Sequence, residues 1–260
     1  MKYLKKFNTL GSAITWDRTG NNSKVSPITY FIEESGQVLY REYVNMTPNG
    51  HDFVDLGLPS GTLWATMNIG ASDPNQAGSY FAWGEIETKN SYTPETYSYH
   101  LEDYPYYTKY NDEDNKLVLD EEDDIAHVLW EGGWHIPTMD QFMELVDNRY
   151  TTLMITSNDS SITIRSKINN NWIALPFAGY KEGETVYTNE GTQGSYLSMN
   201  IKAGSGWTDT SCSDGLEVYK DGTTAYSYTD SYYARGYGYQ VRPVLGDKNY
   251  IYSNSGFTEK

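Results

Sequence analysis

The sequence is poor in cysteine and in positive charge, and it has no long apolar run. A single cysteine, Cys212, in 260 residues excludes an intramolecular disulfide framework. The chain has 19 basic and 35 acidic residues, a net charge of −16, which disfavours nucleic acid and anionic membranes because both attract a positive surface. No apolar stretch approaches transmembrane length, so we expect no membrane insertion.

The usual signatures of catalysis and of metal binding are missing too. The sequence contains no nucleophile elbow, phosphate loop or dinucleotide fingerprint. The histidines are scattered, without zinc-type spacing, at His51, His100, His127 and His135. The opening MKYLKKFNTLGSAITW begins with lysines but lacks the apolar region of a secretion signal. We therefore expect a protein that is not an enzyme and binds no cofactor. We also expect that it is not secreted through a signal peptide.

Tyrosine is abundant where phenylalanine is scarce. There are 25 Tyr and 7 Trp but only 7 Phe, and seven tyrosines fall between Tyr219 and Tyr239 among Ser, Thr, Gly and Asp. Tyr provides a large contact area at low entropic cost, and small polar residues around it adapt their hydrogen bonds, as in an antibody paratope. This composition predicts a ligand-binding surface.

The first 48 residues differ in charge from the rest. They carry a net +2, which leaves −18 for the remainder. Within them, ITYFIEESGQVLYREY predicts a β-hairpin turning at Ser35-Gly36. A single hairpin is not stable alone in water, so we expect residues 1–48 to attach to a larger assembly or to oligomerise. Residues 50–245 are predicted to form the main domain, and residues 246–260 a C-terminal tail.

The main domain is predicted to be α+β. EEDDIAHVLW (121–130) is a helix candidate with acids in its first turn. TMDQ, from Thr138, is a capping box for a second helix that places Phe142, Leu145 and Val146 on one face. After Tyr150 we expect only short strands and turns.

Several motifs, in order, resemble one known family. DFVDLGLPSGTLWATMNIGA, GSYFAWGEIETKNSYT, EEDDIAHVLWEGGWHIPTMDQFMELVD, ALPFAGY and GYQVRPV are similar to the Fibrobacter succinogenes major paralogous domain. The resemblance covers roughly residues 50–245. It implies a fold like that of C-type lectins and of the formylglycine-generating enzyme. The family includes variable proteins of diversity-generating retroelements, in which adenine-directed mutagenesis rewrites a C-terminal segment.

The chain departs from the family at two motifs. Leu197 in GSYLSMN stands where members often have Trp, and Glu131 follows Trp130 where members often have Gly, although the spacing to Trp134 survives. The N-terminal segment is similar to the leader of structural proteins of Bacteroides phages, which leave the cell by lysis. The resemblance therefore implies a virion location, with a bacterial cell surface as the alternative.

Catalysis by the cysteine and calcium binding by the acidic runs are less well supported than ligand binding, and most tryptophans are assigned to packing. A formylglycine-generating site needs a cysteine pair, whereas Cys212 is alone. The acidic runs NDEDN and DEEDD could hold calcium, but a solvated face and a helix N-terminus explain them better. Most tryptophans fall in scaffold motifs of the family, so we assign them to packing: Trp64, Trp83, Trp130, Trp134 and Trp172.

Alignment with the family suggests which positions vary. At each of these positions the residue can be encoded by an Asn codon in which only adenines have been changed. The positions are Tyr226, Tyr228, Asp230, Ser231, Tyr232, Tyr233, Ala234, Gly236 and Tyr237. Arg235 and Gly238 match positions that are fixed in the family. The predicted ligand-binding residues are Trp207, Asp209, Ser211, Ser213, Tyr219, Tyr226, Tyr228, Asp230, Ser231, Tyr232, Tyr233 and Tyr237. We expect exposed tyrosines clustered with a TDTSCSD loop.

The predicted partners follow from this assignment. The ligand is a bacterial surface glycan or a surface protein, residues 1–48 contact other virion proteins, and the chain forms a homo-oligomer. A bacterial surface or structural protein without a specific ligand is the competing hypothesis. We also expect residues 53–57 and 241–245 to lie close together, because lectin-like domains join their two ends in one sheet.

Overall fold

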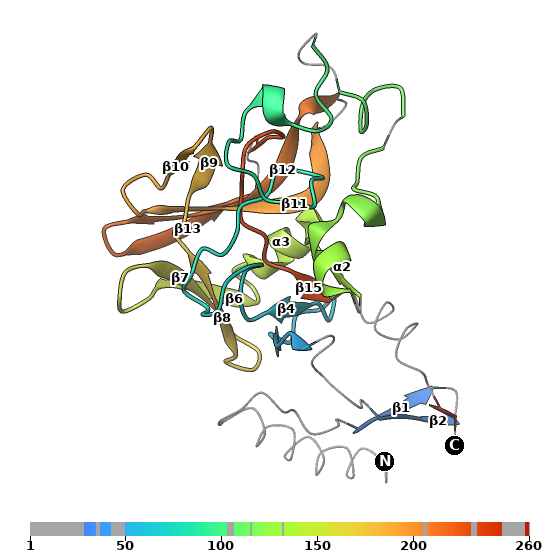
Figure 1. Cartoon of the computed structure of the whole chain (residues 1–260). Coiled ribbons are helices and arrows are strands. Elements are labelled where there is room, and N and C mark those ends of the chain that lie inside the picture. The colour runs from blue at the N-terminus through green and yellow to red at the C-terminus, as the bar shows by residue number, and fades with distance from the viewer. Residues whose placement is uncertain are drawn as a thin grey trace.

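The computed structural model describes residues 29–34, 37–42, 50–102, 107–114, 116–131, 133–204, 207–229, 233–245 and 258–259, with side chains in 50–202 and 210–245 apart from the gaps. In these residues the fold is mixed and mostly β, with two α-helices, which is compatible with the α+β prediction. Figure 1 shows short strands and long connections around the two helices. Within the described residues, no helix has the length and apolar character to cross a membrane.

The predicted N-terminal hairpin is present. Strands β1 (Thr29–Glu34) and β2 (Gln37–Glu42) pair antiparallel, with Glu34 opposite Gln37, so only Ser35 and Gly36 separate them. Strand β16 (Thr258–Glu259) pairs with the other edge of β2 and completes a three-stranded sheet. The predicted tail, residues 246–260, thus contributes a strand to the N-terminal segment.

The two ends of the main domain meet in one sheet, as predicted. Strand β15 (Val244–Leu245) lies between β4 (Leu63–Ala65) and β5 (Trp134–His135), and β3 (Phe53–Asp55) completes the order β3-β4-β15-β5. The domain is therefore closed by the pairing of residues about 180 positions apart in sequence, Trp64 with Val244 and Leu63 with Leu245. The segments between these two ends begin and finish at this sheet.

The two predicted helices form, and the first is shorter than expected. A 3-10 turn η3 (Glu121–Asp123) precedes α2 (Ile125–Trp130), because the side chain of Asp124 accepts hydrogen bonds from the amides of Ala126 and His127 and so fixes the N-cap. Helix α3 (Met139–Leu145) begins at the predicted capping box of Thr138 and Gln141. A second 3-10 turn, η2, covers Pro94–Thr96.

Helix α2 ends at Trp130, which pairs with Trp134 across a turn at Glu131. The rings of Trp130 and Trp134 meet edge to face, with centroids 5.1 Å apart. Between them the chain turns at Glu131, which has a φ of 50° and a ψ of −153°. This backbone region favours glycine, so the side chain of Glu131 imposes strain there.

A three-stranded sheet packs on α3. Strands β6 (Thr151–Ile155), β7 (Ser161–Ser166) and β8 (Trp172–Pro176) pair in order, and Ile162, Ile164 and Leu175 are buried against Phe142. Trp172 does not take part, because it starts β8 and is 47% exposed. Its assignment to packing was wrong, whereas Trp64, Trp83, Trp130 and Trp134 are buried as predicted.

The last third of the domain is built on a long twisted hairpin. Strands β11 (Gln193–Gly204) and β12 (Trp207–Asp221) pair antiparallel, β13 (Thr224–Tyr228) pairs with the end of β12, and β14 (Tyr233–Ala234) pairs with its middle. The predicted TDTSCSD loop is therefore wrong, since these residues lie in β12. A bulge between Ile201 and Lys202 releases Cys212 from β11, and Cys212 pairs with Ala234 instead.

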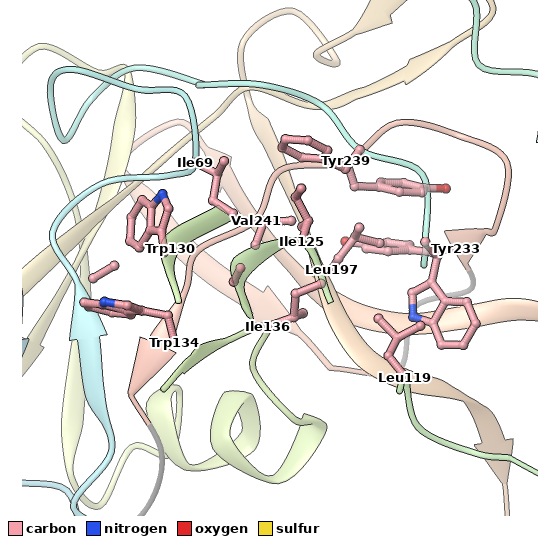
Figure 2. Close-up of a cluster of buried hydrophobic side chains, with 14 of the residues drawn as sticks. Ile69, Leu119, Ile125, Trp130, Trp134, Ile136, Leu197, Tyr233, Tyr239 and Val241 are labelled. Atoms are coloured by element: carbon pink, nitrogen blue, oxygen red, sulfur yellow. The ribbon is translucent and has the colours of Figure 1, made fainter. Parts of the chain in front are cut away.

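A buried cluster joins helix α2 to this hairpin. Figure 2 shows Trp130, Trp134 and Ile69 at one end, and the parallel rings of Tyr233 and Tyr239 at the other. Leu197, at the position where members of the resembled family often have Trp, is fully buried here. The core therefore reaches directly beneath the tyrosine-rich end of the chain.

Candidate ligand-binding surface

Six partly exposed tyrosines lie on neighbouring strands, and we call them the tyrosine face. Its members are Tyr180, Tyr187, Tyr219, Tyr226, Tyr228 and Tyr237. They come from the β9–β10 hairpin, from β12 and β13, and from the turn after β14. In Figure 1 the β9–β10 hairpin and β13 extend toward the same side of the molecule.

Three of these rings stand together on β12 and β13. Tyr219 lies opposite Tyr226 in the strand register, and their rings stack with centroids 6.1 Å apart. Tyr228 meets Tyr219 edge to face at 5.5 Å and is 57% exposed. Alternation along the strands puts these residues on one side of the sheet, because Val218, next to Tyr219 in β12, is fully buried on the other.

The other three rings are centred on Tyr180. Strand β9 (Tyr180–Glu182) pairs with β10 (Thr185–Tyr187), which places Tyr187 opposite Tyr180. The ring of Tyr180 stacks on Tyr187 at 5.5 Å and is parallel to Tyr237 at 6.1 Å. Tyr187 is 45% exposed, so this group also presents aromatic surface to solvent.

Two carboxylates are held by hydroxyl groups of the tyrosine face. The hydroxyl of Tyr237 donates to Oε1 of Glu182 over 2.7 Å, and that of Tyr219 donates to Oε2 of Glu217. Burial and then Glu182 raise the pKa of Tyr180, and Glu217 also contributes. Burial, followed by its hydrogen bond to Glu217, raises the pKa of Tyr219. The two groups of rings therefore share one negative electrostatic environment.

Tyr233 is not a ligand-facing residue, contrary to the prediction. It is 2% exposed, its hydroxyl donates to the carbonyl of Leu216, and it accepts from the amide of Tyr196. The physical reason is Gly215, where an added Cβ would lie 2.2 Å from Cε2 of Tyr233. The missing side chain makes room for the ring. Tyr233 and the stacked Tyr239 form the buried base of the tyrosine face.

Arg235 anchors the segment that carries these tyrosines. It is fully buried, and its guanidinium donates to the carbonyls of Lys109, Tyr110 and Thr210 over 2.9 to 3.0 Å. Aromatic rings surround the cation, the nearest being Tyr107 at 4.1 Å. The position expected to be fixed thus holds β14 and β12 against the scaffold.

The remaining predicted site residues divide into three groups. Ser211 is half-buried, whereas Ser213 is fully buried and bonds to the carbonyl of Tyr233, so Ser213 was wrong as a contact residue. Gly236, proposed as variable, is buried, and an added Cβ would lie 3.0 Å from the carbonyl oxygen of Thr93. The side chains of Trp207 and Asp209 and all of Asp230, Ser231 and Tyr232 lie outside the described residues.

The acidic runs are structural in part. Asp114 accepts backbone hydrogen bonds from Tyr110, Asn111 and Lys116 and closes its own loop. The solvated-face interpretation was wrong for Asp123, which is buried and bonds to Tyr99 and Lys109. In the described part of the chain, no three histidine, cysteine or carboxylate side chains are arranged to hold a metal ion.

Sequence reasoning missed half of the surface. Tyr180 was placed in a scaffold motif, and neither Tyr187, Glu182 nor Glu217 was selected. The available signal was the alternation in YKEGETVY, where a central Gly183 with a φ of 55° permits a tight hairpin. That Tyr180 lies beside Tyr237 follows only from the tertiary structure, since Lys181 and Gly238 exchange backbone hydrogen bonds.

Comparison of the chain with protein-family models, with curated proteins and with solved structures gave no match. The interpretation of the surface therefore depends on its own geometry.

Proposed function

We propose that this chain is a non-enzymatic ligand-binding protein and that the tyrosine face is its binding surface. The observation that carries the proposal is the convergence of six partly exposed rings and two oriented carboxylates from separate segments of the chain. Single exposed aromatic residues are common on protein surfaces, but a contiguous group of them marks an interaction site.

The construction of the surface supports this proposal. Each ring has few rotatable bonds, and neighbouring rings or carboxylates limit its rotation, so little conformational entropy remains to be lost on binding. The base of Tyr233 and Tyr239 is buried and hydrogen-bonded. A buried base below rings that are already restrained lowers the entropic cost of binding.

We further place the protein in the virion of a Bacteroides phage, as a receptor-binding or adhesion protein with a C-type-lectin-like domain. The motif resemblance supports this, and so do the closed β3-β4-β15-β5 sheet and the separate N-terminal hairpin. Residues 1–48 would attach the domain to other virion proteins or to copies of itself. Several copies together would strengthen weak single-site binding.

The test is adhesion of labelled protein to a panel of Bacteroides strains. Replacing Tyr187, Tyr226 and Tyr228 together with Ala should abolish adhesion, since these are the outermost rings of the face. Trp172→Ala is the matched control, because it removes an equally exposed aromatic residue from β8. Adhesion that survives the triple replacement, or that Trp172→Ala abolishes equally, would contradict the proposal.

A bacterial surface protein of similar sequence is the second candidate. Analysis of purified phage particles decides between the two. A virion protein, attached through its N-terminal segment, must be present in them, and a cell-surface protein must be absent. A formylglycine-generating activity stays the weakest alternative. It requires a second cysteine beside Cys212, and the sequence has none.

A further inference from the structure

We infer that the group recognised by the tyrosine face is cationic, an arginine or lysine side chain of a protein partner. This inference rests on the proposed function and adds the chemistry of the ligand. It depends on the placement of Glu182 and Glu217 and on the side chains around them.

The two carboxylates are not neutralised within the described part of the chain. None of the described lysines or arginines makes an ion pair with Glu182 or Glu217. Their hydrogen bonds come instead from neutral donors, the hydroxyls of Tyr237 and Tyr219 and the side-chain amide of Gln193. Both groups are half-buried, so their charge is partly removed from water and uncompensated.

The nearest lysines point away from the surface. Lys181 lies between Tyr180 and Glu182 in β9, and strand alternation turns it to the other side, where its Nζ lies 5.2 Å from the ring centre of Tyr92. Lys220, beside Tyr219 in β12, pairs with Asp159 at 2.7 Å. The strands that carry the acids therefore direct their own cations elsewhere.

The rings add a second attraction for a positive group. The face of an aromatic ring is electronegative, so a guanidinium can stack on it. The N–H groups of that guanidinium lie in the guanidinium plane and can donate to a neighbouring carboxylate. Tyr219 and Tyr237 each hydrogen bond to a carboxylate, Glu217 and Glu182 respectively, which places one ring beside each acid. Oε1 of Glu182 accepts the hydrogen bond from Tyr237, and no described residue donates to Oε2.

A neutral saccharide would use the rings but would leave both charges uncompensated. An acidic surface polysaccharide would also be repelled by a chain of net charge −16. A basic protein segment satisfies the rings and the carboxylates together, and this favours it over a glycan.

The experiment measures binding of the full chain to an acetylated, amidated Gly-Arg-Gly-Arg-Gly peptide by calorimetry. The same peptide with citrulline, the neutral isostere, in place of arginine tests the charge alone. We expect the citrulline peptide to bind about tenfold more weakly, and salt to weaken the arginine peptide selectively. The double variant Glu182→Gln/Glu217→Gln should lose about tenfold in affinity for the arginine peptide.

The control variant is Glu184→Gln/Glu190→Gln, which removes the same charge from exposed positions near β9 and β10. It should change the affinity by less than about twofold, because exposed charges are screened by salt. The inference is overturned if the arginine peptide does not bind, if the citrulline peptide binds equally well, or if both double variants behave alike. Adhesion to cells that survives Glu182→Gln/Glu217→Gln but not the triple tyrosine replacement would retain the binding function and exclude a cationic ligand.

Discussion

The ring of Tyr233 lies parallel to that of Tyr239, with centroids 4.2 Å apart and both rings buried. Tyr233→Ala should therefore lower the free energy of unfolding by about 3–5 kcal/mol, as for other large-to-small changes at buried aromatic sites. Tyr228→Ala is the control and should change it by no more than about 0.5 kcal/mol, since that ring is exposed. Urea unfolding followed by tryptophan fluorescence measures both. Equal effects would show that the base and the exposed ring have been assigned wrongly.

Arg235→Lys tests the anchor of the segment that contains β14. Lysine cannot supply the fork of donors that reaches the carbonyls of Lys109, Tyr110 and Thr210. At least one carbonyl stays buried without a donor, so we expect a loss of about 2 kcal/mol or more. Arg149→Lys, at a site whose side chain is 72% exposed, should be nearly neutral in the same denaturation assay. A neutral Arg235→Lys would mean that the charge alone holds the segment.

Glu131→Gly should stabilise the protein. The backbone of Glu131 has a φ of 50° and a ψ of −153°, a region in which glycine avoids the cost of a side chain. Relief of that strain is worth about 1 kcal/mol, partly offset by the greater entropy of an unfolded glycine. Thermal unfolding by calorimetry gives the sign. Glu131→Ala is the control, because it removes the carboxylate but keeps the strained Cβ; equal gains would assign the cost to charge.

Asp123→Asn should make stability less dependent on pH below about pH 5. Burial alone would raise the pKa of Asp123, but hydrogen bonds from Lys109, Tyr110 and Tyr99 outweigh it and hold that pKa below its usual range. A carboxylate with a depressed pKa stabilises the fold above its unfolded pKa, and this contribution is lost as the pH falls through the folded value. The variant should therefore be about 1.5–3 kcal/mol less stable than wild type at pH 7.

The difference between wild type and Asp123→Asn should then shrink as the pH is lowered, measured by urea midpoints at each pH. Burial raises the pKa of neighbouring Asp124, which acts in the opposite direction but equally in both proteins. A difference that is constant with pH would show that Asp123 contributes by packing rather than by charge.

Residues 50–245 should fold without residues 1–48. Residues 50–245 contain every strand of the closing sheet β3-β4-β15-β5, and the described side chains there form three buried clusters of their own. We expect the truncated domain to be soluble and to unfold cooperatively. Only the full chain, and not the truncated domain, should join a larger particle or oligomer. Circular dichroism and sedimentation measure the two properties. An unfolded truncated domain would show that the N-terminal segment belongs to the core.

Local signals in the sequence predicted local structure well. Ser35-Gly36 marked a hairpin, Thr138 and Gln141 marked a helix start, and both are found because each depends on neighbouring residues. The approach of residues 53–57 to 241–245 came from the motif resemblance rather than from any local pattern. Asp124 shortened a predicted helix because its side chain caps the amides two and three residues ahead.

The candidate site was predicted only in part, because exposure depends on distant residues. Nothing near Tyr233 in sequence distinguishes it from Tyr228, and it is Gly215 on another strand that lets the ring of Tyr233 enter the interior. Trp172 was expected in the core because of its motif, yet it is the first residue of β8, an edge strand of the β6-β7-β8 sheet, and its side chain is exposed. Tyr180 and Tyr187 join the surface through a contact between β9 and Gly238.

Strand β13 has a consequence for how this protein can change over generations. Within the described residues it pairs only with β12, and the rings of Tyr226 and Tyr228 meet one another and that of Tyr219. If the tyrosine face binds as proposed, we expect mutations there to alter what it recognises while the free energy of folding, which depends on Tyr233, Arg235 and the closing sheet, stays nearly constant. Recognition and foldability would then be separable traits in this chain, and selection could act on the first without putting the second at risk.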